Sequence, residues 1–269
     1  MESSESESFQ ALQKTGVLLQ SKVIPKELIQ AWAKTAEECY QRLKAIEQQG
    51  GLEAVQKSLQ PGQKYVPTAS SFTLEVAFPE ENGRGILKEI ASSSVRSCIK
   101  EALGGRAACD LDQAWVRRQY APSRYPARHA PHMWHQDGAL GYDFLGALTT
   151  GHDARALLPM ITCWIPLTPC GVDAPGLEFI VSRTEELLPV TSLQDAFLRS
   201  QYPAEAFWKP AMQAGDLLLF RSGVLHRTYV TPEMSRDRTS IELRFVLGDQ
   251  IPPRLARDRF IALGSVSEW

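Results

Sequence analysis

Short apolar runs, separated by proline, glycine and aspartate, fill the chain from Asp110 onward and restrict its fold more than any other feature. Each run has the length of a strand rather than that of a buried helix. Many short strands with turn signals between them are typical of a sandwich or barrel of the jelly-roll type. We therefore predict an α+β protein with a jelly-roll, cupin-like core over residues 106–250. The expected strands are Gln113–Tyr120, Met160–Leu167, Leu177–Val181, Asp216–Phe220 and Thr239–Leu247.

The first hundred residues have a helical pattern instead. Apolar residues recur at helical spacing from Pro25 to about Gln49 and again from Gly85 to Leu103, after which two glycines would end the helix. A short strand is expected at Val17–Leu19. We predict that residues 10–105 are mainly helical and that their helices pack outside the core.

The two ends of the chain carry little of this patterning. The Ser/Glu-rich residues 1–9 are expected to be disordered, and residues 251–269 to form a C-terminal extension. A chain of 269 residues with 43% hydrophobic content can bury one sizeable core. We therefore expect a single domain over residues 1–269.

Charge and composition exclude several classes of partner. The net charge of −2 gives no electrostatic footprint for nucleic acid or an anionic membrane. No apolar run approaches the roughly 20 residues that span a bilayer, and the first residues lack the features of a signal peptide. We expect a cytoplasmic protein that binds neither nucleic acid nor membrane; the sequence does not indicate an oligomeric state. Its five cysteines contain no C-x-x-C pair and are expected to be reduced and mostly buried.

Three residues form a possible metal site. His135 and Asp137 belong to the segment Trp134-His135-Gln136-Asp137-Gly138, and His226 follows the predicted strand that ends at Phe220. On a strand, residues two apart project to the same side, so Gln136 would point away. Two imidazoles and one carboxylate can occupy one face of an octahedral ion and leave the opposite positions free for substrate and dioxygen, as in mononuclear non-haem Fe(II) oxygenases. Taken singly, an H-x-D tripeptide is weak evidence, and a histidine after a strand is often only packed or exposed.

An arginine on the next strand could hold a carboxylate near this site. Arg238, Ser240 and Glu242 would share one face of that strand, because strand side chains alternate. A guanidinium can bind a carboxylate with two charge-assisted hydrogen bonds, and the Ser240 hydroxyl could add a third. The alternative is that Arg238 is a surface residue of the charged run Arg236-Asp237-Arg238.

Four segments together resemble the phytanoyl-CoA dioxygenase family of Fe(II)/2-oxoglutarate-dependent oxygenases. They occur in the family's order and cover roughly residues 110 to 248. The segments are Trp134-His135-Gln136-Asp137, Thr162-Cys163-Trp164-Ile165-Pro166-Leu167, Gly176-Leu177-Glu178-Phe179-Ile180, and Gly215-Asp216-Leu217-Leu218-Leu219-Phe220 with its continuation to His226 and Arg238.

The resemblance implies a double-stranded β-helix that carries iron on His135, Asp137 and His226. It also implies that Arg238 binds the distal carboxylate of the cosubstrate 2-oxoglutarate and that Trp164 lines the cosubstrate pocket. For the other carboxylate we expect contacts from Gln119 and Thr162, which lie on predicted strands next to the ligands.

The implied activity is hydroxylation of an unactivated C–H bond of a small-molecule substrate with O2, releasing succinate and CO2. Halogenation is disfavoured, because a halogenase of this scaffold lacks the carboxylate ligand that Asp137 supplies here. Two alternatives remain open. The same iron site could catalyse desaturation or cyclisation of a small natural product, or the chain could be a non-catalytic metal-binding jelly-roll protein in which Arg238 points to solvent.

Two departures from the family pattern concern loops around the pocket. Val181-Ser182-Arg183-Thr184 stands where the family usually has Pro-Gly-Ser-His, and the Asn that commonly follows the distal histidine is missing. The family's substrate therefore cannot be carried over, acyl-CoA least of all.

Two loops are possible parts of the substrate site. Residues 123–132 contain two arginines and two histidines that could recognise an anionic or zwitterionic molecule, or could simply be exposed. His129 and His132 within this loop are not expected to bind metal. Residues 138–150 could form a mobile lid or an ordinary loop.

Overall fold

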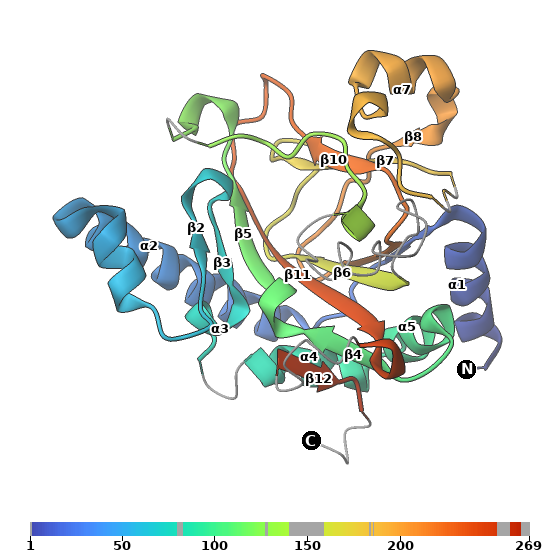
Figure 1. Ribbon diagram of the computed structural model, residues 1–269, viewed down its shortest axis with the longest axis horizontal. Helices are drawn as coiled ribbons and strands as arrows, with labels where there is room; N and C mark the ends of the chain where they lie inside the picture. Colours follow the sequence, from blue (N-terminus) through green and yellow to red (C-terminus); the bar gives the residue numbers. More distant parts are fainter. Residues whose placement is uncertain are drawn as a thin grey trace.

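The computed structural model describes residues 2–79, 83–126, 129–139, 159–182, 184, 186–251 and 259–264 (Figure 1). Most of the predicted lid, residues 140–150, and most of the C-terminal extension lie outside these described residues. Within them the fold is mixed α+β with two antiparallel sheets, as a jelly-roll requires.

The larger sheet has nine strands among the described residues. Its main path runs β1 (Val17–Gln20), β9 (Leu217–Arg221), β6 (Met160–Pro166), β11 (Arg238–Leu247), β5 (Trp115–Gln119), β3 (Ser71–Thr73) and β2 (Tyr65–Val66). Strand β4 (Ala107–Asp110) also pairs with β11, and β12 (Phe260–Ala262) pairs with β4. The smaller sheet has the order β10 (His226–Tyr229), β7 (Gly176–Ile180) and β8 (Phe207–Trp208). The smaller sheet lies across from β6 and β11 of the larger one (Figure 1).

Side-chain alternation on β6 and β11 separates the core from the space between the sheets. Ile241, Leu243 and Phe245 of β11 are fully buried in the main apolar core. Arg238, Glu242 and Arg244 of the same strand line a cavity on its other face. The predicted face pattern of this strand is confirmed, and the polar face is the one that meets the smaller sheet.

Helices cover the outer face of the larger sheet, as predicted. The first long helix, α2 (Lys26–Ser58), starts after Pro25 and extends beyond the expected end; a kink at Gly51, where φ is 70°, lets the chain continue. The second predicted helix is two helices, α4 (Arg84–Ser92) and α5 (Val95–Leu103), because extended backbone at Ser93 interrupts it. Gly104 ends α5 with φ 75°, the left-handed conformation that glycine adopts at low cost.

The structure differs from the predicted disorder of residues 1–9, since helix α1 spans Glu2–Thr15. Leu12 is fully buried in the main core, and Phe9, one helical turn earlier, packs against the same cluster. Two apolar residues on one face therefore dock a segment whose composition alone indicates disorder.

The remaining elements are short. They are α3 (Leu74–Ala77), α7 (Asp195–Gln201) and the 3-10 helices Pro67–Ala69, Leu111–Gln113, Pro122–Arg124, Asp137–Ala139, Val190–Ser192, Ala204–Ala206 and Gly248–Gln250. Among the helices that the structure describes, none is both long and apolar enough to cross a bilayer.

Candidate metal centre and adjoining cavity

The two histidines are held side by side by the backbone. His135 and His226 form an isolated β-bridge in which each backbone N–H donates to the other residue's carbonyl, at N···O distances of 3.0 and 3.1 Å. Each ring also has its Nδ1 near a backbone carbonyl, at 2.6 Å from Met133 and 3.0 Å from Val224. Because a carbonyl only accepts, each Nδ1 carries the proton, and the Nε2 lone pairs are free to bind a metal.

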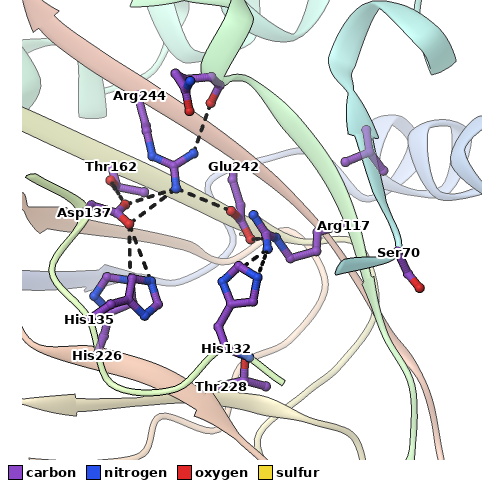
Figure 2. A network of polar contacts seen from close by, with 12 residues as sticks. Ser70, Arg117, His132, His135, Asp137, Thr162, His226, Thr228, Glu242 and Arg244 are labelled. Carbon is purple, nitrogen blue, oxygen red and sulfur yellow. Dashed lines mark hydrogen bonds and ion pairs between the residues drawn. The ribbon is translucent and has the colours of Figure 1, made fainter. Parts of the chain in front are cut away.

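Asp137 completes the group. Its Oδ1 lies 3.7 Å from Nε2 of His135 and 3.6 Å from Nε2 of His226. The three ligand atoms all lie within 4.8 Å of one another, which is a separation that one metal ion can bridge. The predicted triad is thus assembled in space (Figure 2).

The local backbone is not the strand that we predicted. Only His135 forms a strand-like bridge, and Asp137 begins a 3-10 helix whose Gly138 N–H donates to the Ser222 carbonyl. Gln136 does point away from the ligands. Its side-chain amide donates to the carbonyls of Glu186 and Gly223 and accepts from the Leu188 N–H, so it fastens two neighbouring loops to the metal motif.

The other carboxylate oxygen of Asp137 is oriented by residues of the larger sheet. The Thr162 hydroxyl donates to Oδ2 at 2.6 Å, and Nη2 of Arg244 lies 3.3 Å from the same oxygen. Burial opposes ionisation of Asp137, but Arg244, the two imidazoles and the Thr162 hydrogen bond outweigh it and hold the pKa well below its usual range. The carboxylate is therefore ionised, the form in which it binds a metal.

Burial and the neighbouring His226 ring lower the pKa of His135 to about 3. The imidazole of His135 is thus neutral at physiological pH, and its Nε2 lone pair is free to bind a metal.

A cavity of about 350 Å³ adjoins the triad. Residues of both sheets line it, among them Leu177 and Thr228 on the smaller sheet and Trp164 on the larger. The space between the two sheets is therefore open next to the ligand atoms, as a site that admits a substrate requires.

Arg238 is the most deeply buried cation that lines this cavity. Its residue is 1% exposed, and its guanidinium lies 5.0 Å from the centre of the Trp164 ring. Among the described residues, Nε and Nη1 of Arg238 have no hydrogen-bond partner, and neither do Nε1 of Trp164 and Oγ of Ser240. Buried donors left without acceptors are costly, so this group of atoms fits an anion such as the carboxylate of 2-oxoglutarate.

The structure places the other predicted contacts differently. Thr162 lines the cavity, with its hydroxyl bound to Asp137. Ser240 is buried next to Arg238 on β11, outside the set of lining residues. Gln119 pairs with Arg238 across the β5–β11 ladder, but it does not line the cavity, and its amide faces the Tyr120 carbonyl at 3.4 Å.

Neither of the two loop histidines belongs to the triad. His132 meets the His135 ring edge-on, with centroids 5.6 Å apart, and lines the cavity. His129 packs against Tyr120 and Tyr125, away from the ligands.

Sequence reasoning missed a chain of charged contacts along the cavity wall (Figure 2). From Asp137 it passes to Arg244, then to Glu242 at 3.7 Å, and on to Nε of Arg117 at 2.9 Å; Nη1 of Arg117 in turn lies 2.6 Å from Nε2 of His132. The signal that could have found it is the occurrence of charged residues on one face of strands that are otherwise apolar. Arg117 sits opposite Ser240 on β5 and reaches the same face.

A second charged cluster lies behind the histidines. Trp134, which precedes His135, donates its indole N–H to Asp195 at 2.8 Å. Arg227, which follows His226, pairs with Asp195 at 2.9 Å and with the fully buried Glu178 at 2.6 Å. Asp195 therefore ties together the residues next to both imidazole ligands.

Comparison with known proteins agrees with this geometry. The family model described as phytanoyl-CoA dioxygenase (PhyH) matches residues 12–234. No curated protein matches the sequence significantly.

Among solved structures, the iron-bound form of EctD from S. alaskensis is similar with a TM-score of 0.63 and 14% identity, covering 97% of this chain and 88% of that one. The α-ketoglutarate-dependent carbocyclase SnoK from nogalamycin biosynthesis has a TM-score of 0.60 at 13% identity, with 96% of both chains covered. The epimerase SnoN from the same biosynthesis has a TM-score of 0.59 at 12% identity, covering 98% of this chain and 100% of that one. At these identities the structural matches establish the fold.

Proposed function

Because this chain belongs to the phytanoyl-CoA dioxygenase family of Fe(II)/2-oxoglutarate-dependent oxygenases, we propose that it hydroxylates an unactivated C–H bond of a small-molecule substrate. The observation that carries the proposal is a triad spaced to bind one metal ion, beside the buried guanidinium of Arg238. Nε and Nη1 of this guanidinium have no hydrogen-bond partner among the described residues. When bound, Fe(II) and 2-oxoglutarate supply oxidation by O2, with release of succinate and CO2.

The protein residues have separate tasks in this proposal. His135, Asp137 and His226 hold the iron on one face. Arg238 takes the distal carboxylate of 2-oxoglutarate, next to the flat face of Trp164 and the hydroxyl of Ser240. Thr162 orients Asp137 instead of binding the cosubstrate directly, and we assign no cosubstrate contact to Gln119, because it does not line the cavity.

Apolar side chains limit the access of water to the ligands. Phe220 packs against the His226 ring with centroids 4.6 Å apart, and Leu177 and Trp164 line the same cavity. A dry site strengthens the interactions of the triad with its ligand and protects a reactive centre from side reactions. The protein's further contribution is to hold one C–H bond of the substrate close to the metal.

A first experiment tests the metal and cosubstrate sites without any substrate. Anaerobic addition of Fe(II) and 2-oxoglutarate should give a weak visible charge-transfer band, and Asp137→Ala should abolish it. Arg238→Met should raise the 2-oxoglutarate concentration needed for the band roughly a hundredfold, since two charge-assisted hydrogen bonds contribute about 3 kcal/mol together. Arg236→Met is the matched control, because its side chain is 58% exposed.

Two results would contradict the proposal. Absence of the band at saturating 2-oxoglutarate would favour a metal-binding protein without oxygenase activity. Equal effects of the Arg238 and Arg236 substitutions would mean that Arg238 is not the cosubstrate anchor.

A related oxidation is the second candidate, since the structures similar to this chain include a protein described as a carbocyclase and one described as an epimerase, besides EctD, whose structure contains 5-hydroxyectoine. The product mass separates these reactions once a substrate is found by succinate release. Hydroxylation adds one oxygen, cyclisation or desaturation removes two hydrogens, and epimerisation leaves the mass unchanged.

A further inference from the structure

We propose that the part of the cavity lined by Arg117 binds a substrate with one negative charge, such as a monocarboxylate, through the guanidinium of Arg117. This inference rests on the proposed function, because it concerns the second ligand of the same cavity. It is carried by the charges that line the cavity and by the contacts that each arginine already makes.

The cavity has a surplus of one positive charge. Its described lining residues include three arginines, Arg117, Arg238 and Arg244, but only two carboxylates, Asp137 and Glu242. The two positive charges of Fe(II) and the two negative charges of 2-oxoglutarate cancel. One positive charge then remains in a buried site, where charges interact more strongly than in water, and a monoanionic substrate would neutralise it.

The contacts indicate which arginine is available. In the proposed function Arg238 is occupied by the cosubstrate. Arg244 is occupied by Asp137 and by the Gln113 carbonyl, to which its Nη1 donates at 3.1 Å. Nε of Arg117 lies 2.9 Å from Glu242 but has no hydrogen-bond partner among the described residues, and Nη1 donates to His132 at 2.6 Å. Glu242 is moreover shared with Arg244, so it neutralises Arg117 only in part.

His132 orients this guanidinium without cancelling its charge. Nη1 of Arg117 donates to Nε2 of His132 at 2.6 Å, and this contact fixes the direction of the guanidinium. The backbone N–H of His132 donates to the Thr228 hydroxyl at 3.2 Å, and Thr228 also lines the cavity. Arg117 and Thr228 thus present polar groups to the cavity next to the two histidines and Asp137 (Figure 2).

The structure also separates Arg117 from the basic loop that the sequence indicated. Arg124 of that loop has a side chain that is 52% exposed, pairs with Asp237 at 3.1 Å and does not line the cavity. Of the loop's described residues, His132 is the one that lines the cavity. Recognition of an anion is therefore assigned to the strand residue Arg117, and the loop supplies His132 as its hydrogen-bond partner.

The test uses protein loaded anaerobically with Fe(II) and saturating 2-oxoglutarate. Monocarboxylates of increasing chain length and their matching primary amides are titrated in, and binding is followed by the shift of the visible band and by calorimetry. We expect at least one acid to bind tenfold or more tightly than its amide while the band persists. Arg117→Gln should remove this difference, Arg117→Lys should retain part of it, and the control Arg124→Gln should keep it.

The outcomes separate this inference from the function on which it rests. Absence of the band in the wild-type protein overturns both. A normal band with equal binding of acids and amides overturns only the role of Arg117. So does binding of the acids that abolishes the band, because they would then be displacing 2-oxoglutarate. The wild-type comparison decides the matter even where Arg117→Gln does not fold.

Discussion

Glu178 is the buried carboxylate at the centre of the charged cluster that lies behind the two histidines. It lies on β7, is fully buried, and accepts from Nε of Arg227 at 2.7 Å. Arg199 and Lys209 approach its other oxygen at 3.3 and 3.5 Å. Because Arg227 directly follows His226, we predict that Glu178→Gln lowers the stability of the fold and weakens metal binding together.

The size of the effect follows from the burial of the partners. Removing one member of a fully buried ion pair costs about 3–5 kcal/mol. The three cations keep between 21% and 41% of their side-chain surface exposed and can turn to water, so the lower end, about 3 kcal/mol, applies. With an unfolding entropy of roughly 2.1 cal/mol/K per residue, a chain of 269 residues should lose about 5 °C in Tm.

Thermal unfolding followed by circular dichroism measures the loss, and competition with a coloured chelator measures Co(II) affinity. Asp173→Asn is the matched control, because the Asp173–Arg236 pair has exposed fractions of 51% and 58% and should contribute less than about 1 kcal/mol. Equal Tm values for the two variants would refute the assignment of Glu178 as a buried anchor. A lowered Tm with unchanged Co(II) affinity would refute its link to the metal centre.

Three further predictions concern other contacts. Thr162→Val removes the 2.6 Å hydrogen bond to Asp137 and should weaken Co(II) binding tenfold or more at nearly unchanged Tm, measured by the same competition; unchanged affinity would contradict the role of Thr162. Gly171→Ala should destabilise the protein by at least about 2 kcal/mol more than Gly62→Ala, measured by urea unfolding. Both glycines have φ +89°, but a Cβ added at Gly171 would lie 2.2 Å from the Pro210 carbonyl oxygen, whereas a Cβ added at Gly62 would have no described atom within 4 Å. Burial raises the pKa of Cys98 and Cys170 to about 11 and leaves all five thiols inaccessible, so a disulfide reagent at pH 8 should label none in the native protein and five after unfolding; rapid native labelling would contradict this.

The sequence predicted the large sheet and the triad well because their signals are local. Short apolar runs located β6, β9 and β11 to within about one residue at each end. The core face and the polar face of β11 followed from the alternation of side chains along a strand. Arg238 could be singled out before its burial was known because it lies at the start of the strand that follows the distal histidine, on the face that it shares with Ser240 and Glu242.

The missed features depend on contacts between distant segments. Strand β10 has the sequence His226-Arg227-Thr228-Tyr229, which contains no apolar alternation, because its side chains face the cavity and the charged cluster around Glu178. Arg117 is one of several arginines on the chain, and only its pairing opposite Ser240 places it in the cavity. Spacing in sequence cannot reveal which carboxylate such a side chain meets.

The metal centre lies at the junction of the two sheets, and this position explains why the two clusters around it differ. The imidazoles are bridged to each other through their backbones, and His226 is part of the smaller sheet. Asp137 is oriented by Thr162 on β6 and Arg244 on β11, both in the larger sheet. A shift of the smaller sheet would therefore move both imidazoles together relative to the carboxylate, so a weakened Glu178 cluster should change the affinity of the whole triad rather than free one ligand.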